Sequence, residues 1–302
     1  MSGKPAYFAK WLRHRVVFPA LALLPAALGY RIASRIGRRD ALRHPARAAV
    51  MHGLLTIHPH LANEPQHLEA LLDHYFRMMA KDMLDCFRMP AFTPRNTHEL
   101  IRVAGIDKLA AAKAAGKGVI LIISHYSRFF MLGPGLKFAG QEFGMFTTVV
   151  DERHPHYDPV DRWYIATKLH NTQLFSRGSW ITTGDDRRKI YRALEAGEVI
   201  LIALDGTETS SPTRYDFPFL GGILSLPEGI VRIAARTGAK MVYAATVEEG
   251  DGVAINIHPL PDDPVAGLGE AVRILERDVI AYPWQWWQWA AHGALWRPAP
   301  AN

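Results

Sequence analysis

The chain is poor in cysteine and lacks the motifs of several large enzyme classes. Cys86 is the only cysteine in 302 residues, which excludes an intramolecular disulfide and a zinc site built from several cysteines. The histidines show no spacing typical of a metal site; His58 and His60, for example, are separated by Pro59. The sequence contains no Walker loop, dinucleotide-binding glycine motif or Gly-x-Ser-x-Gly elbow, so it does not indicate a nucleotide-binding protein or an α/β-hydrolase.

Acidic residues are nearly absent from the first sixth of the chain. Residues 1–50 contain ten Lys or Arg and a single acid, Asp40, which gives this segment a charge of +9. Because the whole chain has a formal charge of +6, the remainder carries −3. The basic character therefore belongs to the N-terminal segment, and the main part of the chain has no feature of a nucleic-acid-binding protein.

A long hydrophobic run is also missing. Residues 16–30 are uncharged but contain Pro19 and Pro25, and they fall short of the roughly 20 apolar residues that span a bilayer. Together with the flanking basic residues, they predict a membrane-associated helix within residues 1–40, lying in or dipping into an anionic membrane surface. A signal peptide, an organellar transit peptide and a buried helix of the main domain are the alternatives.

Residues 41–302 are predicted to form one α/β domain with a mostly parallel central sheet flanked by helices. Short apolar runs alternate there with segments of helical periodicity, which is typical of such a sheet. The predicted strands are 119–123, 145–150, 198–204 and a hairpin of 241–247 with 253–258; the predicted helices are 65–89, 106–115, 185–196, 268–280, a short one in 129–136 broken at Gly133 and Pro134, and one that starts with a capping box at 225–228.

Polar residues follow two of the predicted strands directly. Ser124 and His125 come after 119–123, and Asp205 ends the run 198–204. Open α/β sheets place their ligands at the carboxyl ends of the strands, where a histidine can act as general base for a hydroxyl or an amine. The alternatives are a histidine that only caps its strand and an Asp-Gly turn at Asp205.

Residues 116–132 resemble the active-site block of the glycerolipid-type acyltransferases, and most closely the late acyltransferases of lipid A synthesis. In that family a strand ends in His-x4-Asp/Glu, in which the acid orients the histidine that deprotonates the acceptor. His125 matches the histidine, but Phe130 occupies the acid position and Arg128 stands where the family often has Asn. Asp205 matches the aspartate of a family Asp-Gln pair, although Gly206 replaces the glutamine.

The resemblance also implies substrate-binding positions. Arg153 matches a basic residue that helps to bind substrate, and Phe219 and Gly221 lie in a segment similar to an aromatic-rich family motif. Ser127 and Arg128, beside His125, are expected to bind substrate too, with Arg128 contacting the acyl donor or the developing oxyanion.

Tryptophan is concentrated at the end of the chain. Residues 282–296 hold five of the eight tryptophans. This density suits a membrane interface, an acyl-chain surface or a packed family element.

The resemblance implies a membrane-associated acyltransferase on the cytoplasmic face of the inner membrane. It would transfer a fatty acyl group from acyl carrier protein or coenzyme A to a lipid or glycolipid, with the acyl thioester as co-substrate and no other cofactor. An acidic carrier protein would suit the basic N-terminal segment. Phe130 leaves open a catalytically inactive homologue that binds acyl chains or carrier protein. A carboxylate near the His125 ring, from Asp205, Asp151 or Glu152, would favour the enzyme.

Overall fold

The protein is built around a seven-stranded sheet with the strand order β1-β9-β8-β2-β5-β3-β4. The computed structural model describes residues 4–150, 157–207 and 211–300. The sheet strands are β1 (Ile101–Ala104), β2 (Val119–Ile123), β3 (Gly144–Thr147), β4 (Trp180–Thr182), β5 (Val199–Ala203), β8 (Lys240–Glu249) and β9 (Gly252–Pro259). In this sheet the neighbouring strands β8, β2, β5, β3 and β4 are parallel, β1 is parallel to β9, and the β8–β9 hairpin is the antiparallel pair among the described strands. The predicted mostly parallel α/β sheet is therefore confirmed.

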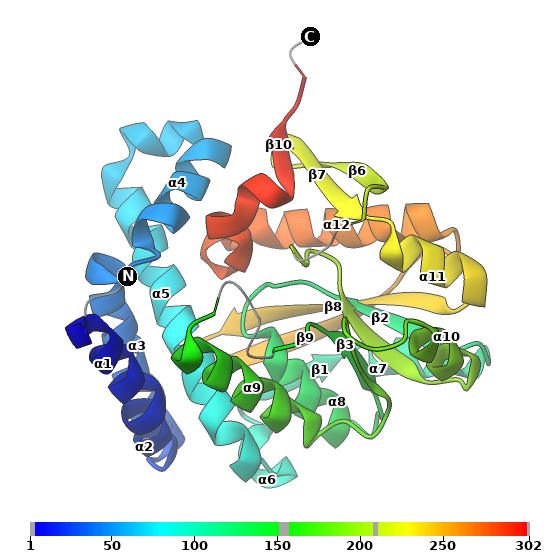
Figure 1. Ribbon diagram of the computed structural model, residues 1–302, viewed down its shortest axis with the longest axis horizontal. Helices are drawn as coiled ribbons and strands as arrows, with labels where there is room; N and C mark the ends of the chain where they lie inside the picture. The colour runs from blue at the N-terminus through cyan, green and yellow to red at the C-terminus, as the bar shows by residue number, and fades with distance from the viewer. Residues whose placement is uncertain (1–3, 151–156, 208–210, 301–302) are drawn as a thin grey trace.

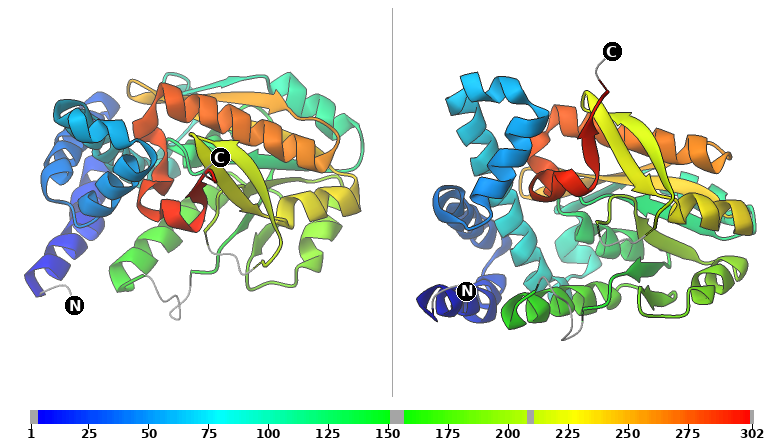
Figure 2. Two further views of the ribbon diagram at one scale, coloured as in Figure 1. Left: turned by 90° about the horizontal axis from the view of Figure 1, so that it is seen from above. Right: turned by 45° about the horizontal axis from the view of Figure 1, so that its top comes forward.

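Helices cover both faces of the sheet (Figure 1 and the right-hand view of Figure 2). Alternate side chains of β2 enter two separate hydrophobic cores, Ile120 and Ile122 on one face and Leu121 and Ile123 on the other. All five residues of β2 are buried, as expected for a strand covered on both sides. The helices are α1 (Lys4–Leu12), α2 (Phe18–Ala22), α3 (Ala26–Arg43), α4 (Arg47–Ile57), α5 (Pro65–Arg88), α6 (Pro94–Thr97), α7 (Ile106–Ala114), α8 (Leu132–Phe138), α9 (Pro159–Gln173), α10 (Arg188–Glu195), α11 (Gly229–Thr237) and α12 (Pro264–Ala281).

The uncharged N-terminal stretch is folded onto the domain. Residues 13–17 form a short π-helix that leads into α2, and Phe18 and Tyr30 are completely buried. Helix α3 lies against α5, and a Cβ on Gly37 would come within 2.4 Å of the Phe76 carbonyl oxygen, so only glycine allows this close approach. Within the described residues no helix is long and apolar enough to cross a membrane. The predicted N-terminal membrane helix is thus unconfirmed, and a buried helix accounts for part of the stretch.

A small second sheet was not expected from the sequence. It consists of β6 (Arg214–Phe219), β7 (Gly222–Pro227) and β10 (Trp296–Pro298), with β7 in the centre. The predicted capping box at 225–228 is wrong, because Ser225 belongs to β7 and its amide donates to the Leu295 carbonyl at 2.7 Å. Helix α11 instead begins at Gly229, and no side chain caps it.

Two predicted helix boundaries also shift. Helix α8 continues through Gly133 and Pro134, since proline is tolerated in the first turn, where its missing amide hydrogen is not needed. Helix α10 begins at Arg188 rather than at 185, because the Asp185 carboxylate accepts hydrogen bonds from the amide and hydroxyl of Thr182 in the preceding turn.

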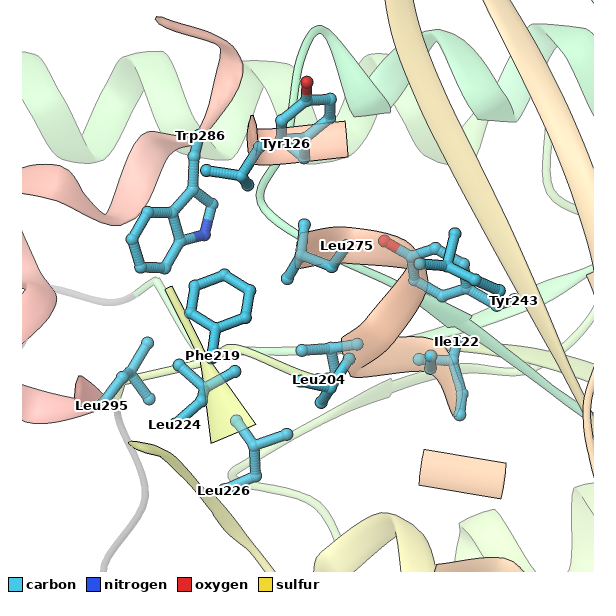
Figure 3. Packing of buried hydrophobic residues seen from close by; sticks show 14 of the residues in the cluster. Ile122, Tyr126, Leu204, Phe219, Leu224, Leu226, Tyr243, Leu275, Trp286 and Leu295 are labelled. Atoms are coloured by element: carbon cyan, nitrogen blue, oxygen red, sulfur yellow. The ribbon is translucent and has the colours of Figure 1, made fainter. Parts of the chain in front are cut away.

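The tryptophans of the C-terminal segment are mostly core residues. Trp286 and Trp289 are fully buried and Trp296 is 8% exposed. Figure 3 shows the Trp286 indole beside the Phe219 ring, with a centroid separation of 5.3 Å. The segment was expected to be a membrane interface, an acyl-chain surface or a packed element. For Trp286, Trp289 and Trp296, the packed element is the interpretation that fits.

Candidate active site

His125 and Asp205 meet at the carboxyl edge of the sheet. Strands β2 and β5 are parallel neighbours with Ile123 opposite Ala203, and each functional residue lies two positions beyond this pair. Adjacent strands are about 4.8 Å apart, so the two side chains come within reach of each other. The His125 Nδ1 atom is 2.9 Å from Asp205 Oδ1. The sequence prediction that these residues share one edge agrees with this geometry.

The Asp205 carboxylate is held by several donors and is completely buried. Its oxygens accept the His125 backbone amide at 2.9 and 3.1 Å and the Trp286 indole N–H at 3.4 Å. The Asp205 carbonyl accepts a hydrogen bond from the Gln288 side chain at 2.9 Å. These contacts fix the carboxylate in one orientation against the imidazole, as a positioning residue requires.

This arrangement determines which ring nitrogen of His125 is available. A carboxylate can only accept, so Nδ1 carries the hydrogen and Nε2 presents its lone pair. The His125 side chain is 28% exposed, and no other described residue hydrogen-bonds to Nε2. The Phe129 ring lies edge-on at 5.1 Å and Trp287 lies at 6.4 Å. Chemically, the pair is a histidine base with an orienting carboxylate.

Phe130, at the family's acid position, belongs to an apolar wall beside this pair. Its ring lies 4.3 Å from Phe129 and 4.2 Å from the Lys168 ammonium. Lys168 is buried and forms an ion pair with Asp82. A cation over the face of an aromatic ring is a favourable contact. The carboxylate that contacts His125 thus comes from the neighbouring strand and not from the residue five positions later.

Arg128 is a buried structural cation. It is 0% exposed, it pairs with Asp85 at 2.9 Å and Glu248 at 3.1 Å, and it donates to the carbonyls of Asp251 and Gly252. Burial raises the pKa of Asp85 to about 6 even though Arg128 opposes the shift. The Arg128 guanidinium exposes no atom to a substrate, so this placement conflicts with the predicted contact to the donor or the oxyanion.

Ser127 is part of a strained turn and is also inaccessible. Its φ is 57°, in the left-handed region, and it is 0% exposed. Its amide donates to the Gln285 carbonyl at 2.7 Å, and its carbonyl accepts the Trp287 indole N–H at 2.7 Å. Such strain is tolerated where surrounding contacts over-determine the backbone. Ser127 therefore fastens the loop after His125 to the tryptophan segment and offers no surface for substrate.

The remaining predicted substrate residues are a buried residue, a turn residue and a residue outside the described chain. Phe219 is 1% exposed, and its carbonyl accepts the Trp296 indole N–H at 2.9 Å. Gly221, with φ of 71°, is an exposed residue in the tight turn between β6 and β7. Arg153 falls outside the described residues, as do Asp151 and Glu152.

A cavity of about 720 Å³ opens beside the loop that carries Asp205. Thr207, two residues after Asp205, lines it together with His52 and Tyr157. Residues 290–294 also line it and contribute three alanines, one glycine and His292. Cavities of this size take small ligands or parts of larger ones. Within the described chain, no cluster of three or more His, Cys, Asp or Glu residues could hold a metal ion.

Sequence reasoning missed the groups that hold Asp205 and shape this cavity. The Trp286 indole donates to the Asp205 carboxylate, Gln288 donates to the Asp205 backbone carbonyl, and His52 lines the cavity. The only signal was the dense Trp-Gln-Trp-Trp-Gln-Trp run at 284–289, which indicated a special element but not its contact with Asp205.

The fold and the site define an α/β transferase with a histidine–carboxylate pair at the carboxyl edge of a parallel sheet. The model of the bacterial lipid A biosynthesis acyltransferase family matches residues 2–289, and the chain belongs to this family. It is accordingly an acyltransferase, as the resemblance at His125 and Asp205 implied.

Curated relatives agree with this assignment. The chain is 26% identical over 289 residues to the phosphatidylinositol mannoside acyltransferase of Mycolicibacterium smegmatis, covering 93% of this chain and 88% of that protein. It is 26% identical over 291 residues to the protein of the same name from Mycobacterium tuberculosis, covering 93% and 85%.

Proposed function

We propose that the protein transfers a fatty acyl group from a thioester, carried by acyl carrier protein or coenzyme A, to a hydroxyl group of a lipid or glycolipid. The observation that carries this proposal is the 2.9 Å contact between His125 Nδ1 and the buried Asp205 carboxylate. It leaves Nε2 as the ring nitrogen that can act as a base, on a side chain that is 28% exposed. The acyl thioester is the only co-substrate in this proposal, and no cofactor takes part.

The reaction follows from the free Nε2. This atom accepts the proton of the acceptor hydroxyl while the hydroxyl oxygen forms a bond to the thioester carbonyl carbon. The tetrahedral intermediate then breaks its carbon–sulfur bond, and the imidazolium returns the proton to the leaving thiolate. Asp205 stabilises the imidazolium through Nδ1 and keeps the ring in the productive tautomer. Phe130 suggested an inactive acyl-binding homologue, but Asp205 supplies a carboxylate 2.9 Å from His125 Nδ1, which favours the enzyme.

The acceptor in this proposal is a glycolipid. The two mycobacterial relatives are named for a mannosylated lipid. The cavity beside Asp205 combines small residues at 290–294 with hydrogen-bonding side chains of His52, Tyr157 and Thr207. Hydroxyl, imidazole and phenol groups suit a sugar head group, since each can donate or accept a hydrogen bond. We therefore place the polar head of the acceptor in this cavity.

Membrane association belongs to the same proposal. Helix α1 exposes apolar side chains, with Phe8 60% exposed and Trp11 39% exposed, and their rings stack at 6.1 Å. Lys10 pairs with Asp158 and Asp161 and so attaches the helix to α9. An amphipathic helix with aromatic residues can lie in a membrane interface without crossing it. We propose that α1 seats the enzyme on the cytoplasmic face of the inner membrane.

The central experiment compares the parent protein with His125→Ala. Purified protein is incubated with a labelled acyl thioester and a total lipid extract, and labelled products are separated and identified by mass. We expect the rate of acyl transfer to fall by at least about 100-fold, because a positioned base contributes that much or more. His98→Ala is the matched control, since it removes an exposed histidine outside the site. Parent-like transfer by folded His125→Ala would exclude His125 as the base.

The acceptor cavity is tested by narrowing it. Thr207→Phe places a large ring at its wall, so we expect a higher KM for the acceptor lipid. Hydrolysis of the acyl donor by water should continue at the parent rate, since His125 and Asp205 are unchanged. An unchanged acceptor KM would move the head group out of this cavity.

A further inference from the structure

A second cavity, of about 700 Å³, is lined by four arginines. Arg31, Arg35 and Arg38 come from α3 and Arg77 comes from α5. The three on α3 are four and three residues apart, so they lie on one face of the helix over about 10 Å. Asp251, in the β8–β9 turn, is the one acid in the lining.

Three arginines of α3, namely Arg31, Arg35 and Arg38, have no partner among the described residues. No hydrogen bond, ion pair or ring contact joins the side chains of Arg31, Arg35 or Arg38 to another described residue. By contrast, Arg77 pairs with Asp73 at 2.7 Å, and the Asp251 carboxylate is 3.3 Å from Lys81. Three uncompensated guanidinium groups around one cavity are the chemistry that binds phosphate, which they can contact through paired N–H groups.

The start of α3 adds to the positive character of the same cavity. Pro25, Ala27 and Leu28, from the first turn of this helix and the residue before it, also line the cavity. The helix dipole places partial positive charge there, which favours an anion. This end is also apolar, since Leu28 lines the cavity and Leu23, in the turn before α3, is 87% exposed.

From these contacts we infer that the cavity between α3, α5 and the β8–β9 turn binds the phosphate group of an anionic phospholipid. The arginines hold the phosphate, and Leu28, in the same lining, contacts the beginning of an acyl chain. A free phosphate or an acidic protein could contact the same arginines, but neither accounts for the apolar residues at this end of the cavity. The inference goes beyond acyl transfer and does not depend on it.

The cavity is also connected to the catalytic loop. Arg128, three residues after His125, donates to the Asp251 carbonyl at 2.7 Å and to the Gly252 carbonyl at 2.6 Å. The turn that lines the lipid cavity is thus held by the loop that follows the catalytic histidine. Lipid bound there would lie against the same framework that positions His125.

The test uses two double variants of the full-length protein that lose the same charge from the same helix. Arg35→Gln with Arg38→Gln removes two cavity residues, and Arg39→Gln with Arg43→Gln removes two exposed arginines that do not line the cavity. Binding is measured by sedimentation with vesicles of phosphatidylcholine containing phosphatidylglycerol, and with phosphatidylcholine alone. General attraction to an anionic surface strengthens vesicle binding about fivefold for each basic residue, so both pairs should lose the same amount of affinity from this cause. We expect the cavity pair to bind at least about tenfold more weakly than the control pair, because it also loses charge-assisted hydrogen bonds.

A soluble probe separates the sources of phosphate. Calorimetry with dihexanoyl-phosphatidylglycerol should give binding to the parent and the control pair and little to the cavity pair, and inorganic phosphate should bind at least about tenfold more weakly. Equal weakening of both pairs would reduce the site to diffuse surface attraction. If inorganic phosphate bound as tightly as dihexanoyl-phosphatidylglycerol, the cavity would be a free-phosphate site. If the cavity pair lost binding to acyl carrier protein but kept its binding to vesicles, the cavity would be a protein-docking site. Each of these results overturns the inference, whether or not His125 and Asp205 catalyse transfer.

Discussion

Replacing Asp205 by asparagine removes one charge from the active site with almost no change in shape. The parent carboxylate accepts from three groups, namely His125 Nδ1, the His125 amide and the Trp286 indole. An asparagine has only one side-chain oxygen, and its NH₂ group would face one of these donors or force Nδ1 to become the acceptor. In that case the hydrogen moves to Nε2, and the ring can no longer take the proton of the acceptor hydroxyl.

The expected loss can be bounded from this geometry. Asp205 is fully buried and His125 is 28% exposed, so water can stabilise the imidazolium only in part when the carboxylate charge is gone. In the serine-protease triad the equivalent change lowers kcat about 10⁴-fold through the wrong tautomer. We expect a decrease in kcat of about 10³- to 10⁴-fold for Asp205→Asn. The KM for the acyl donor should stay near the parent value, because Asp205 lies behind the ring and contacts no substrate.

Single-turnover acyl transfer from a labelled thioester, followed at several pH values, is the suitable assay. Thermal unfolding and vesicle binding of Asp205→Asn serve as controls for the fold. A folded Asp205→Asn protein that retains more than about a tenth of the parent kcat would show that another group orients His125. Phe130→Glu on the same background should not restore transfer, because the side chain at position 130 packs against Lys168 and Phe129 rather than in the place of Asp205.

Three further changes test other parts of the structure. In urea titrations, Arg128→Ala should lower the free energy of unfolding by about 3–5 kcal/mol, because it leaves buried carboxylates unpaired. The control Arg102→Ala, at an exposed ion pair, should change it by less than about 1 kcal/mol. Equal losses in the two variants would contradict the structural role of Arg128. Burial lowers the pKa of His258 in the folded state, so the unfolded chain binds a proton more readily and the folded protein loses stability as the pH falls below about 6.5. In urea titrations, His258→Gln should lose less free energy of unfolding than the parent between about pH 7 and pH 5. The same pH dependence in both proteins would refute this. Phe8→Ser with Trp11→Ser should weaken sedimentation with vesicles at unchanged stability, and parent-like sedimentation would remove α1 from the membrane contact.

The contact between His125 and Asp205 could be predicted because it depends on local patterns. Two short apolar runs, each ending in a polar residue, were enough to place His125 and Asp205 at one sheet edge, since neighbouring parallel strands end together. The sequence did not require β2 and β5 to be neighbours. Their register, with Ile123 opposite Ala203, is a tertiary property.

The residues that were misplaced depend on distant partners. Arg128 looked like a substrate ligand because it is three residues from His125, but its partner Asp85 lies 43 residues earlier, on α5. Ser225 fits both a capping box and a strand, and the choice is made by β6 and by the Leu295 carbonyl 70 residues later. The uncharged stretch at 16–30 has the composition of both a membrane anchor and a buried helix, and burial of its Tyr30 depends on a residue as distant as Asp85.

The separation of base and acid onto two strands has a consequence for how the enzyme becomes active. In a His-x4-Asp/Glu arrangement both groups lie on one loop, whereas here the pair exists only after residues 80 positions apart have come together through the pairing of β2 with β5. The final hydrogen bonds come from Trp286 and Gln288, near the end of the chain. A folding chain in which residues 286–288 have not yet packed against Asp205 would therefore hold His125 without its supported partner. In the proposed mechanism, acyl transfer would begin only after this segment has packed.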